Sequence, residues 1–248
     1  MERQKLSTIA HGRHPIAAPL SDASVRDLIE QLQLPPGASV IDVGCGPAEW
    51  LIRILERYDV TGVGVDLSPA VLQRAREEAE RRGVADRITF REENAERLRD
   101  VYEVHDLVLC IGSTHALGGL VKAMETLHCL VKPGGQLVVG DGFWERTPDA
   151  TAVNLFGGDP DHYFNFGITI DHCSSSGLTP LHAHASTQTE WDEYEWSWIG
   201  SIRRYVREHP DDPDAEELWE AAYDHGQEYL HGYRGTLGFV TCLLTKYE

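Results

Sequence analysis

The stretch Val40-Ile41-Asp42-Val43-Gly44-Cys45-Gly46-Pro47-Ala48-Glu49 decides the fold of this chain of 248 residues. An apolar run ends in an acid, passes two glycines separated by one residue, and continues into a helical pattern. Glycine permits a positive φ and has no Cβ to obstruct a ligand, and the first N–H groups of the next helix are free to bind one. The stretch therefore predicts a strand, a tight turn and a helix that together hold a nucleotide-like cofactor.

The residues around the two glycines separate two classes of cofactor. A dinucleotide-binding turn has the pattern Gly-x-Gly-x-x-Gly, with a pyrophosphate above the start of the helix. Glu49 stands where the third glycine of that pattern would be, and its carboxylate would repel a pyrophosphate. Asp42, two residues before the first glycine, suits a cationic ligand. These features disfavour an NAD-dependent oxidoreductase, which is kept as an alternative.

Later stretches continue the alternation of strands and helices. Residues 61–66 form a second apolar strand that ends in Asp66, 24 residues after Asp42, where a doubly wound fold has its ribose-binding carboxylate. Residues 88–95 alternate like a third strand and end in Asn94-Ala95, and residues 106–113 form a fourth. Residues 130–139 contain Lys-Pro-Gly-Gly between a helical and a strand pattern. This rhythm is typical of a parallel sheet.

Together these motifs resemble those of the class I (Rossmann-like) S-adenosylmethionine-dependent methyltransferases, whose first motif is acid-x-Gly-x-Gly-x-Gly. Ala48 replaces its third glycine, and Asn94 replaces an acid at the adenine edge. The resemblance covers roughly residues 36–142 and implies a three-layer, doubly wound α/β fold whose sheet is mostly parallel with an antiparallel last strand. It implies S-adenosyl-L-methionine as cofactor and S-adenosyl-L-homocysteine as product. The residues that it places at the cofactor are Asp42, Gly44, Cys45, Gly46, Asp66, Leu67, Asn94, Ala95, Ile111 and Gly112.

The segments outside this core predict one methyltransferase domain, residues 1–248, with a helical and aromatic cap. We expect residues 1–34 to form an N-terminal lid, 36–142 the cofactor-binding core, and 143–170 and 188–234 insertions that cover the substrate. Loops that leave the carboxyl ends of parallel strands line the ligand crevice of such folds. The predicted substrate residues are Asp141, Trp144, Tyr194, Trp198 and Arg234.

The expected reaction is transfer of the sulfonium methyl group to a small-molecule nucleophile by in-line displacement. His115 follows the fourth strand at the methyl-bearing end and is the candidate general base, with an unperturbed pKa of about 6.5. A helix-terminal packing role is an equally good interpretation of this histidine. The acceptor atom is open between oxygen, nitrogen, sulfur and carbon, and a non-catalytic S-adenosylmethionine-binding protein is a further alternative.

Composition narrows the partners. A formal net charge of −18 without a stripe of Lys and Arg disfavours nucleic acid. The apolar runs are shorter than a membrane span and the N-terminus lacks a signal pattern, so we expect a cytoplasmic protein. Five cysteines without a Cys-x-x-Cys pair argue against disulfides and structural zinc, and His182-x-His184 lacks a third ligand, so no metal is expected. No feature indicates an oligomeric state.

Overall fold

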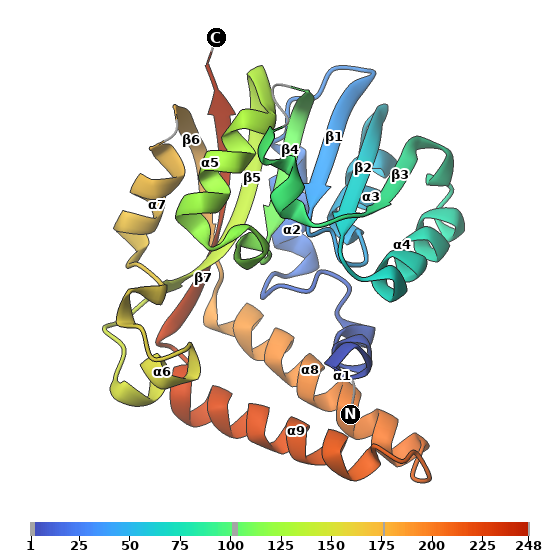
Figure 1. Cartoon of the computed structure of the whole chain (residues 1–248), viewed down its shortest axis with the longest axis vertical. Helices are drawn as coiled ribbons and strands as arrows, with labels where there is room; N and C mark the ends of the chain where they lie inside the picture. The colour runs from blue at the N-terminus through green and yellow to red at the C-terminus, as the bar shows by residue number, and fades with distance from the viewer. Residues whose placement is uncertain (1–2, 101–103, 176, 248) are drawn as a thin grey trace. The chain divides into compact units, whose positions relative to one another are not determined.

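The computed structural model describes residues 3–100, 104–175 and 177–247, and Figure 1 shows the elements that these residues form. The chain divides into two compact units. The sheet unit comprises Ser21–Gly142, Phe166–Ala185 and Phe239–Glu248. The helical unit comprises Met1–Leu20, Phe143–Asn165 and Ser186–Gly238. Two of the boundaries fall inside strands, β5 and β7, which continue from one unit into the other.

The sheet has seven strands in the order β3-β2-β1-β4-β5-β7-β6. The pairs β1/β2, β2/β3, β1/β4 and β4/β5 are parallel, whereas β6 and β7 are antiparallel. This confirms the predicted α/β fold, a mostly parallel sheet with an antiparallel last strand. The strands are β1 Ala38–Val43, β2 Val60–Asp66, β3 Ile88–Glu92, β4 His105–Ile111, β5 Val131–Trp144, β6 Leu178–Ala185 and β7 Leu237–Lys246.

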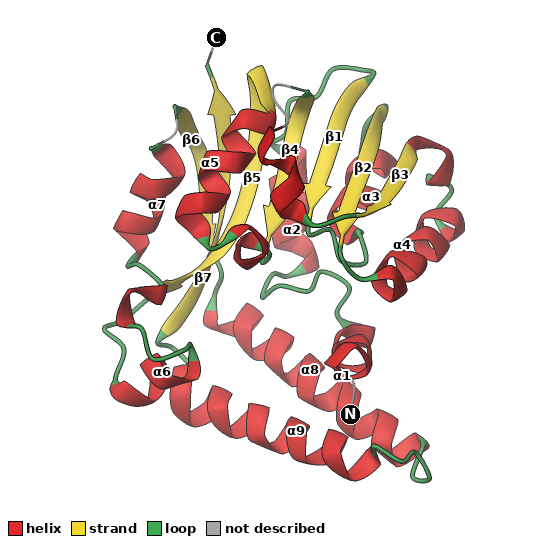
Figure 2. Cartoon of the chain, in the orientation of Figure 1, coloured by secondary structure: helices red, strands yellow, loops and turns green. Residues whose placement is uncertain are grey.

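Helices cover both faces of the sheet within the sheet unit. In Figure 2, α5 and α7 lie in front of the strands and α2 and α3 behind them. The central strands are therefore shielded on both sides, which explains why Val40, Val65 and Leu107 have no exposed surface. The helices are α2 Asp22–Glu30, α3 Glu49–Arg57, α4 Pro69–Arg81, α5 Leu120–Leu130 and α7 Phe166–Ser174, with 3-10 turns η2 Ala85–Arg87, η3 Ala95–Asp100 and η4 Thr114–Leu117.

The helical unit is built on α8, the longest helix described. Thr187 and Glu190 form a capping box at its start, and each side chain binds a backbone N–H group of the other residue. Its apolar face contributes Ile199 and Ile202 to a buried cluster with residues of α1 and α9. The elements of this unit are α1 Arg3–Ala10, η1 His11–Arg13, α6 Ala150–Leu155, η5 Pro160–His162, α8 Gln188–Glu208, α9 Ala215–Glu228 and a π-helical turn, η6 Tyr229–Tyr233.

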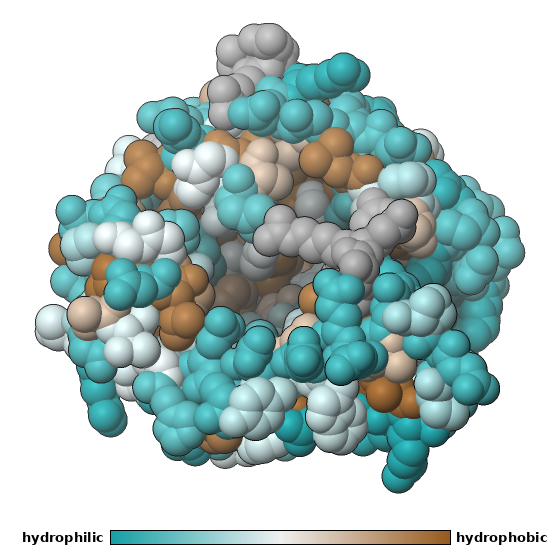
Figure 3. Space-filling model, turned by 60° about the horizontal axis from the view of Figure 1, so that its bottom comes forward, coloured by the Kyte–Doolittle hydropathy of each residue, from teal (hydrophilic) through white to brown (hydrophobic). Residues whose placement is uncertain are grey.

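Two details differ from the expected layout. The N-terminal segment 1–34 is divided, because residues 1–20 belong to the helical unit while α2 packs in the sheet unit. The Lys-Pro-Gly-Gly residues lie inside β5, which begins at Val131 directly after α5, and they interrupt its pairing with β4 between Val131 and Gln136. Hydrophilic residues predominate on the face drawn in Figure 3. Within the described residues, no helix combines the length and apolarity needed to cross a membrane.

Candidate functional site

The glycine turn after β1 is held against the end of β2. The N–H groups of Gly44 and Cys45 both donate to the Val65 carbonyl, at 2.8 and 2.9 Å. Gly44 has φ +72°, and a Cβ at this position would overlap the Ser113 side chain. A Cβ at Gly46, with φ +53°, would meet no atom within 4 Å. Close packing therefore demands the first glycine, while the second leaves bare backbone beside open space, as a cofactor cradle requires.

Ala48 takes the place of the family's third glycine and also takes up its conformation. Its φ of 59° and ψ of 28° lie in the left-handed region, and its N–H donates to the Cys45 carbonyl at 2.8 Å. An alanine in this region costs about 1–2 kcal/mol relative to the ordinary helical region. The turn thus keeps a glycine-like backbone despite the substitution, and α3 begins at the next residue.

Asp66, at the end of β2, accepts two backbone N–H groups. Gly46 donates to its Oδ2 at 3.0 Å and Ser68 donates to its Oδ1 at 2.9 Å. A carboxylate oxygen has a second lone pair, so each can still accept a ligand hydroxyl. Leu67 follows with 62% of its surface exposed, which leaves an apolar side chain beside the carboxylate. This arrangement fits a ribose and an adjoining flat base.

Asp42, at the end of β1, is only 3% exposed. Burial, and after it the nearby charge of Asp66, raise the pKa of Asp42 to about 7. Burial, with the charges of the same two acids, also raises the pKa of the Cys45 thiol. A cation placed here would favour the ionised form of Asp42. The electrostatics of the turn therefore suit a positively charged ligand group such as a sulfonium or an ammonium.

Glu49 gives weaker evidence about the cofactor than its sequence position indicated. The side chain is buried and accepts hydrogen bonds from Arg53 Nε at 2.5 Å and Arg82 Nη1 at 2.9 Å. Two guanidinium groups thus offset the charge that was expected to repel a pyrophosphate. The case against a dinucleotide rests instead on the buried Asp42 and on the missing third glycine.

The remaining predicted cofactor residues lie at the ends of β3 and β4. Asn94 Oδ1 accepts the Glu96 N–H at 2.9 Å, and the buried Ala95 begins η3. Ile111 ends β4, and the N–H of Gly112 donates to the Gly140 carbonyl at 2.8 Å. All the predicted cofactor residues therefore meet at the carboxyl edge of β1–β4, toward which the arrowheads of these strands point in Figure 1. Their binding role stays a prediction.

The loops after β4 and β5 are joined at the same edge. The hydroxyl of Thr114, in η4, donates to Asp141 Oδ2 at 2.8 Å, and the Gly142 N–H donates to Asp141 Oδ1 at 2.7 Å. Next to Thr114, the predicted base His115 is exposed. The structure thus brings His115 and Asp141 to one corner of the sheet unit, where their chemical roles remain predictions.

Trp144, predicted as a substrate residue, is only 6% exposed and belongs to an aromatic cluster of the helical unit. Its ring meets Phe156 and Tyr163 edge to face, with centroids 5.8 and 5.4 Å apart. Its Nε1 donates to the Pro160 carbonyl at 2.9 Å. Phe156 in turn contacts Tyr233 at 5.6 Å. Trp144, Phe156, Tyr163 and Tyr233 therefore form one continuous cluster of aromatic rings, the aromatic wall.

The other predicted substrate residues have partners inside the helical unit. Trp198 stacks on the imidazole of His225, with 3.9 Å between ring centroids. Arg234 forms a two-pronged ion pair with Asp192, in which Nε and Nη2 each donate at 2.8 Å. Tyr194 is half-buried and meets Trp191 edge to face. These contacts organise the unit and leave the predicted substrate roles untested.

Glu195 is a candidate functional residue that the sequence analysis missed. It is 2% exposed and accepts from the Tyr233 hydroxyl at 2.9 Å, while His225 Nε2 lies 2.5 Å from its other oxygen. Burial and the Glu195 charge raise the pKa of Tyr233. One signal could have found this residue, because Trp191, Glu195, Trp198 and Ile202 follow one another at steps of four, three and four. An acid on an apolar helix stripe needs buried partners.

Trp191 adds an unsatisfied donor to the aromatic wall. The side chain is 8% exposed, and its Nε1–H has no hydrogen-bond partner among the residues described. Its ring lies 6.2 Å from that of Tyr233 and 6.4 Å from that of Tyr194. A buried indole N–H usually finds an acceptor, so this position is suited to an oxygen or nitrogen atom of a ligand.

No metal site takes shape from the residues that the structure describes, since no three His, Cys, Asp or Glu side chains are grouped to hold an ion. His182 and His184 lie on β6, where His182 is exposed and His184 half-buried.

This chain is similar to known proteins in both sequence and fold. Residues 40–135 match a family described as a methyltransferase domain. A S-adenosylmethionine-dependent methyltransferase from Geobacter sulfurreducens, solved in complex with S-adenosyl-L-homocysteine, superposes with a TM-score of 0.88 at 26% identity over 97% of each chain. The matched family segment begins in β1 and ends in β5, so it contains every predicted cofactor residue.

Two relatives extend the similarity along the chain. The Escherichia coli protein YjhP is 27% identical over 88% of each chain. The 27-O-demethylrifamycin SV methyltransferase of Amycolatopsis mediterranei is 30% identical over 69% of this chain and 66% of its own length. The similarity to YjhP and to the Geobacter structure thus extends well beyond the glycine turn and the strands around it.

Proposed function

The chain is a class I S-adenosylmethionine-dependent methyltransferase, and we propose that it methylates a small-molecule nucleophile by in-line displacement. The observation that carries the proposal is the pair of carboxylates at adjacent strand ends: the buried Asp42 and the turn-binding Asp66. They flank a turn whose second glycine leaves its backbone open. When bound, S-adenosylmethionine supplies an electrophilic methyl group on a sulfonium ion.

The residues of the turn divide the binding work. Asp66 would accept the ribose hydroxyls with the lone pairs that Gly46 and Ser68 leave free. Leu67 would pack against the adenine, and Asn94 and Ala95 would bound its edge. Asp42 would stabilise the cationic end through its ionised form. Gly44, Cys45, Ile111 and Gly112 would supply close backbone contacts.

For the chemical step, the protein must align the acceptor with the methyl group, about 3–3.5 Å away. His115 would remove a proton from an acceptor that arrives protonated, because an exposed imidazole can exchange that proton with water at neutral pH. Asp141 would position the loop that carries His115 through its bond from Thr114. An acceptor that is already nucleophilic would need no base.

We propose that residues 143–170 and 188–234 act as the substrate cap and residues 1–34 as a lid over one domain, with 36–142 as the cofactor core. Trp144, Tyr194 and Trp198 would present aromatic surface to the acceptor, and Arg234, paired with Asp192 inside the cap, would be a further substrate residue. The unsatisfied Nε1–H of Trp191 favours an acceptor that carries an oxygen or nitrogen atom. The rifamycin relative, which by its name methylates an organic small molecule, supports this class.

The net charge of −18 further supports a free small molecule, rather than nucleic acid, as the acceptor, and we propose that the protein acts in the cytoplasm. Nucleic-acid binding draws on clustered Lys and Arg that neutralise phosphates. The chain instead carries 40 acidic and 22 basic residues.

The test is calorimetric titration with S-adenosylmethionine, S-adenosylhomocysteine and NAD. We expect both sulfur ligands to bind and NAD not to bind, and Asp66→Ala to weaken binding by about a hundredfold because two backbone N–H groups and the ribose lose their acceptor. Asp86→Ala, an exposed acid in η2, is the matched control and should bind like the parent protein. Binding of NAD alone would overturn the proposal, and binding without turnover across an acceptor screen would favour the non-catalytic alternative.

A further inference from the structure

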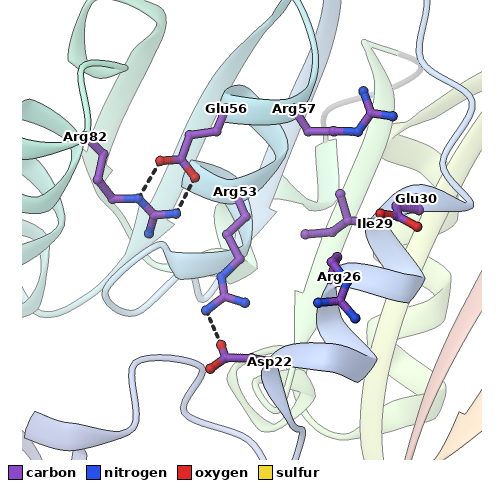
Figure 4. A pocket seen from close by; sticks show the side chains of 8 residues that line it. All are labelled: Asp22, Arg26, Ile29, Glu30, Arg53, Glu56, Arg57 and Arg82. Atoms are coloured by element: carbon purple, nitrogen blue, oxygen red, sulfur yellow. Dashed lines mark hydrogen bonds and ion pairs between the residues drawn. The ribbon is translucent and has the colours of Figure 1, made fainter.

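A pocket of about 420 Å³ opens on the surface of the sheet unit, between α2 and α3 (Figure 4). Four of its lining residues are arginines, namely Arg26, Arg53, Arg57 and Arg82. Three are acids, and Ile29 is apolar.

Two of the arginines are already bound and form the pocket wall. Arg53 Nη2 donates to Asp22 Oδ1 at 2.5 Å, and Arg82 Nε donates to Glu56 Oε1 at 2.8 Å. Both guanidinium groups also bind Glu49, the first residue of α3. These ion pairs neutralise two of the three lining acids and fix α2, α3 and the end of α4 around the pocket.

The other two arginines keep most of their donors. Arg26 makes one long contact, 3.4 Å, with its chain neighbour Asp27, and both side chains are about two-thirds exposed. The guanidinium of Arg57 lies over the Tyr58 ring, 5.4 Å from its centroid. In Figure 4 neither side chain is joined to a lining acid. Each guanidinium offers five N–H donors in a fixed fork that matches phosphate and carboxylate oxygens.

Arg26 and Arg57 are the lining arginines that are left open to an anion. Of the lining acids, Glu30 alone has no ion pair with a lining arginine among the described residues, so its charge would oppose an anion in this pocket. Ile29 lies between Arg26 and Arg57 in Figure 4 and gives an apolar surface for the rest of a ligand. We propose that this pocket binds a small organic anion through Arg26 and Arg57, which hold its phosphate or carboxylate group.

The test is calorimetric titration of the full chain with inorganic phosphate and, separately, with succinate, at constant ionic strength. We expect saturable binding with a dissociation constant of about 1 mM for at least one of them, as for a ligand held by two charged contacts. Binding of phosphate alone identifies a phosphorylated ligand, and binding of succinate alone a carboxylate. No saturable binding of either anion would overturn the proposal.

Two variants assign the binding to this pocket. The double variant Arg26→Ala/Arg57→Ala should weaken binding at least tenfold, whereas Arg207→Ala, an exposed arginine in α8, should leave it unchanged. Glu30→Gln keeps both arginines and removes the opposing charge, so it should tighten binding about threefold. Equal affinity in the double variant, or no gain in Glu30→Gln, would contradict the assignment. Saturation with S-adenosylhomocysteine should not displace the anion.

Discussion

The two units of the chain position their functional groups by different means. In the sheet unit, carboxylates at strand ends bind backbone N–H groups of short turns, as Asp66 binds Gly46 and Ser68. In the helical unit, a buried acid binds side chains from distant helices, as Glu195 binds His225 and Tyr233. Backbone groups do not change with substitution, whereas side chains do. The turns of the sheet unit are therefore tied to groups that every substitution keeps, while the buried network of the helical unit can be altered one residue at a time.

The largest effect is expected from a variant that destabilises the helical unit and leaves the sheet unit intact. Glu195→Gln removes the charge from a 2%-exposed acceptor of two side-chain hydrogen bonds, so it should lower the free energy of unfolding by about 2 kcal/mol. The affinity for S-adenosylhomocysteine should stay within twofold of the parent protein. Chemical denaturation and calorimetry measure the two quantities.

Glu193→Gln is the control, because Glu193 is exposed on the same helix and the substitution makes the same chemical change. It should lower the free energy of unfolding by less than about 0.5 kcal/mol, the usual range for surface positions. If both variants lower the free energy of unfolding by the same amount, the buried network around Glu195 stabilises the protein no more than a surface position does. A large loss of cofactor affinity in Glu195→Gln would instead show that the two regions are not separable.

A pH titration examines the sheet unit. A carboxyl whose pKa is raised to about 7 favours the folded state most below its ordinary pKa of 3.8, and this contribution is lost as the pH rises through 7. A cationic ligand reverses the preference, since it needs Asp42 ionised. Binding of S-adenosylmethionine should therefore weaken about fivefold between pH 7 and pH 6, because the ionised fraction of Asp42 falls from about one half to about one tenth. Calorimetry at several pH values measures it.

Asp42→Asn should bind S-adenosylmethionine more weakly at pH 8 and should lose the pH dependence. Asp66, whose charge also raises the pKa of Asp42, is unchanged in this variant. Any pH dependence that Asp66 itself causes would therefore remain, and this serves as the internal control. A pH profile that survives in Asp42→Asn would assign the proton to another group. Binding that strengthens at low pH would show that Asp42 does not face the cationic end of the cofactor.

The contrast also explains which features the sequence predicts. The glycine turn, Asp66 and the alternation of strands and helices follow from short-range patterns, because each depends on residues within one βαβ unit. Of the two partners of Glu49, Arg53 stands four residues on and could have been expected, whereas Arg82 lies 33 residues away. Glu195 was missed because its partners lie 30 and 38 residues along the chain. Pairing between distant side chains has no periodic signature.

A smaller effect is expected at Trp191, in the region proposed to bind the methyl acceptor. Trp191→Phe removes the buried N–H that lacks a partner while it keeps the aromatic ring. Stability should not fall, because an unsatisfied polar group is deleted, whereas the KM for the acceptor should rise about fivefold if that N–H binds it. Trp196→Phe, 47% exposed on the same helix, is the control. A lower stability with unchanged KM would assign Trp191 a packing role alone.

The smallest effects compare the two alanines with positive φ, one in each unit: Ala17 with φ 52° and Ala48 with φ 59°. Glycine would relieve about 1–2 kcal/mol of backbone strain at either site and add about 0.5–1 kcal/mol of chain entropy to the unfolded state. Ala48 has no exposed surface, so its variant also loses a buried methyl group worth about 0.8 kcal/mol.

We therefore expect Ala17→Gly to stabilise the protein by about 0.5 kcal/mol and Ala48→Gly to leave its stability nearly unchanged, both measured by chemical denaturation. Ala79→Gly, inside α4 and equally buried, has no strain to relieve and should be destabilising by more than 1 kcal/mol. A gain above 1 kcal/mol in Ala48→Gly would mean that its methyl group contributes little to packing. A loss of that size would mean that the turn tolerates the left-handed alanine without strain, and that packing around the methyl group holds the cofactor turn in shape.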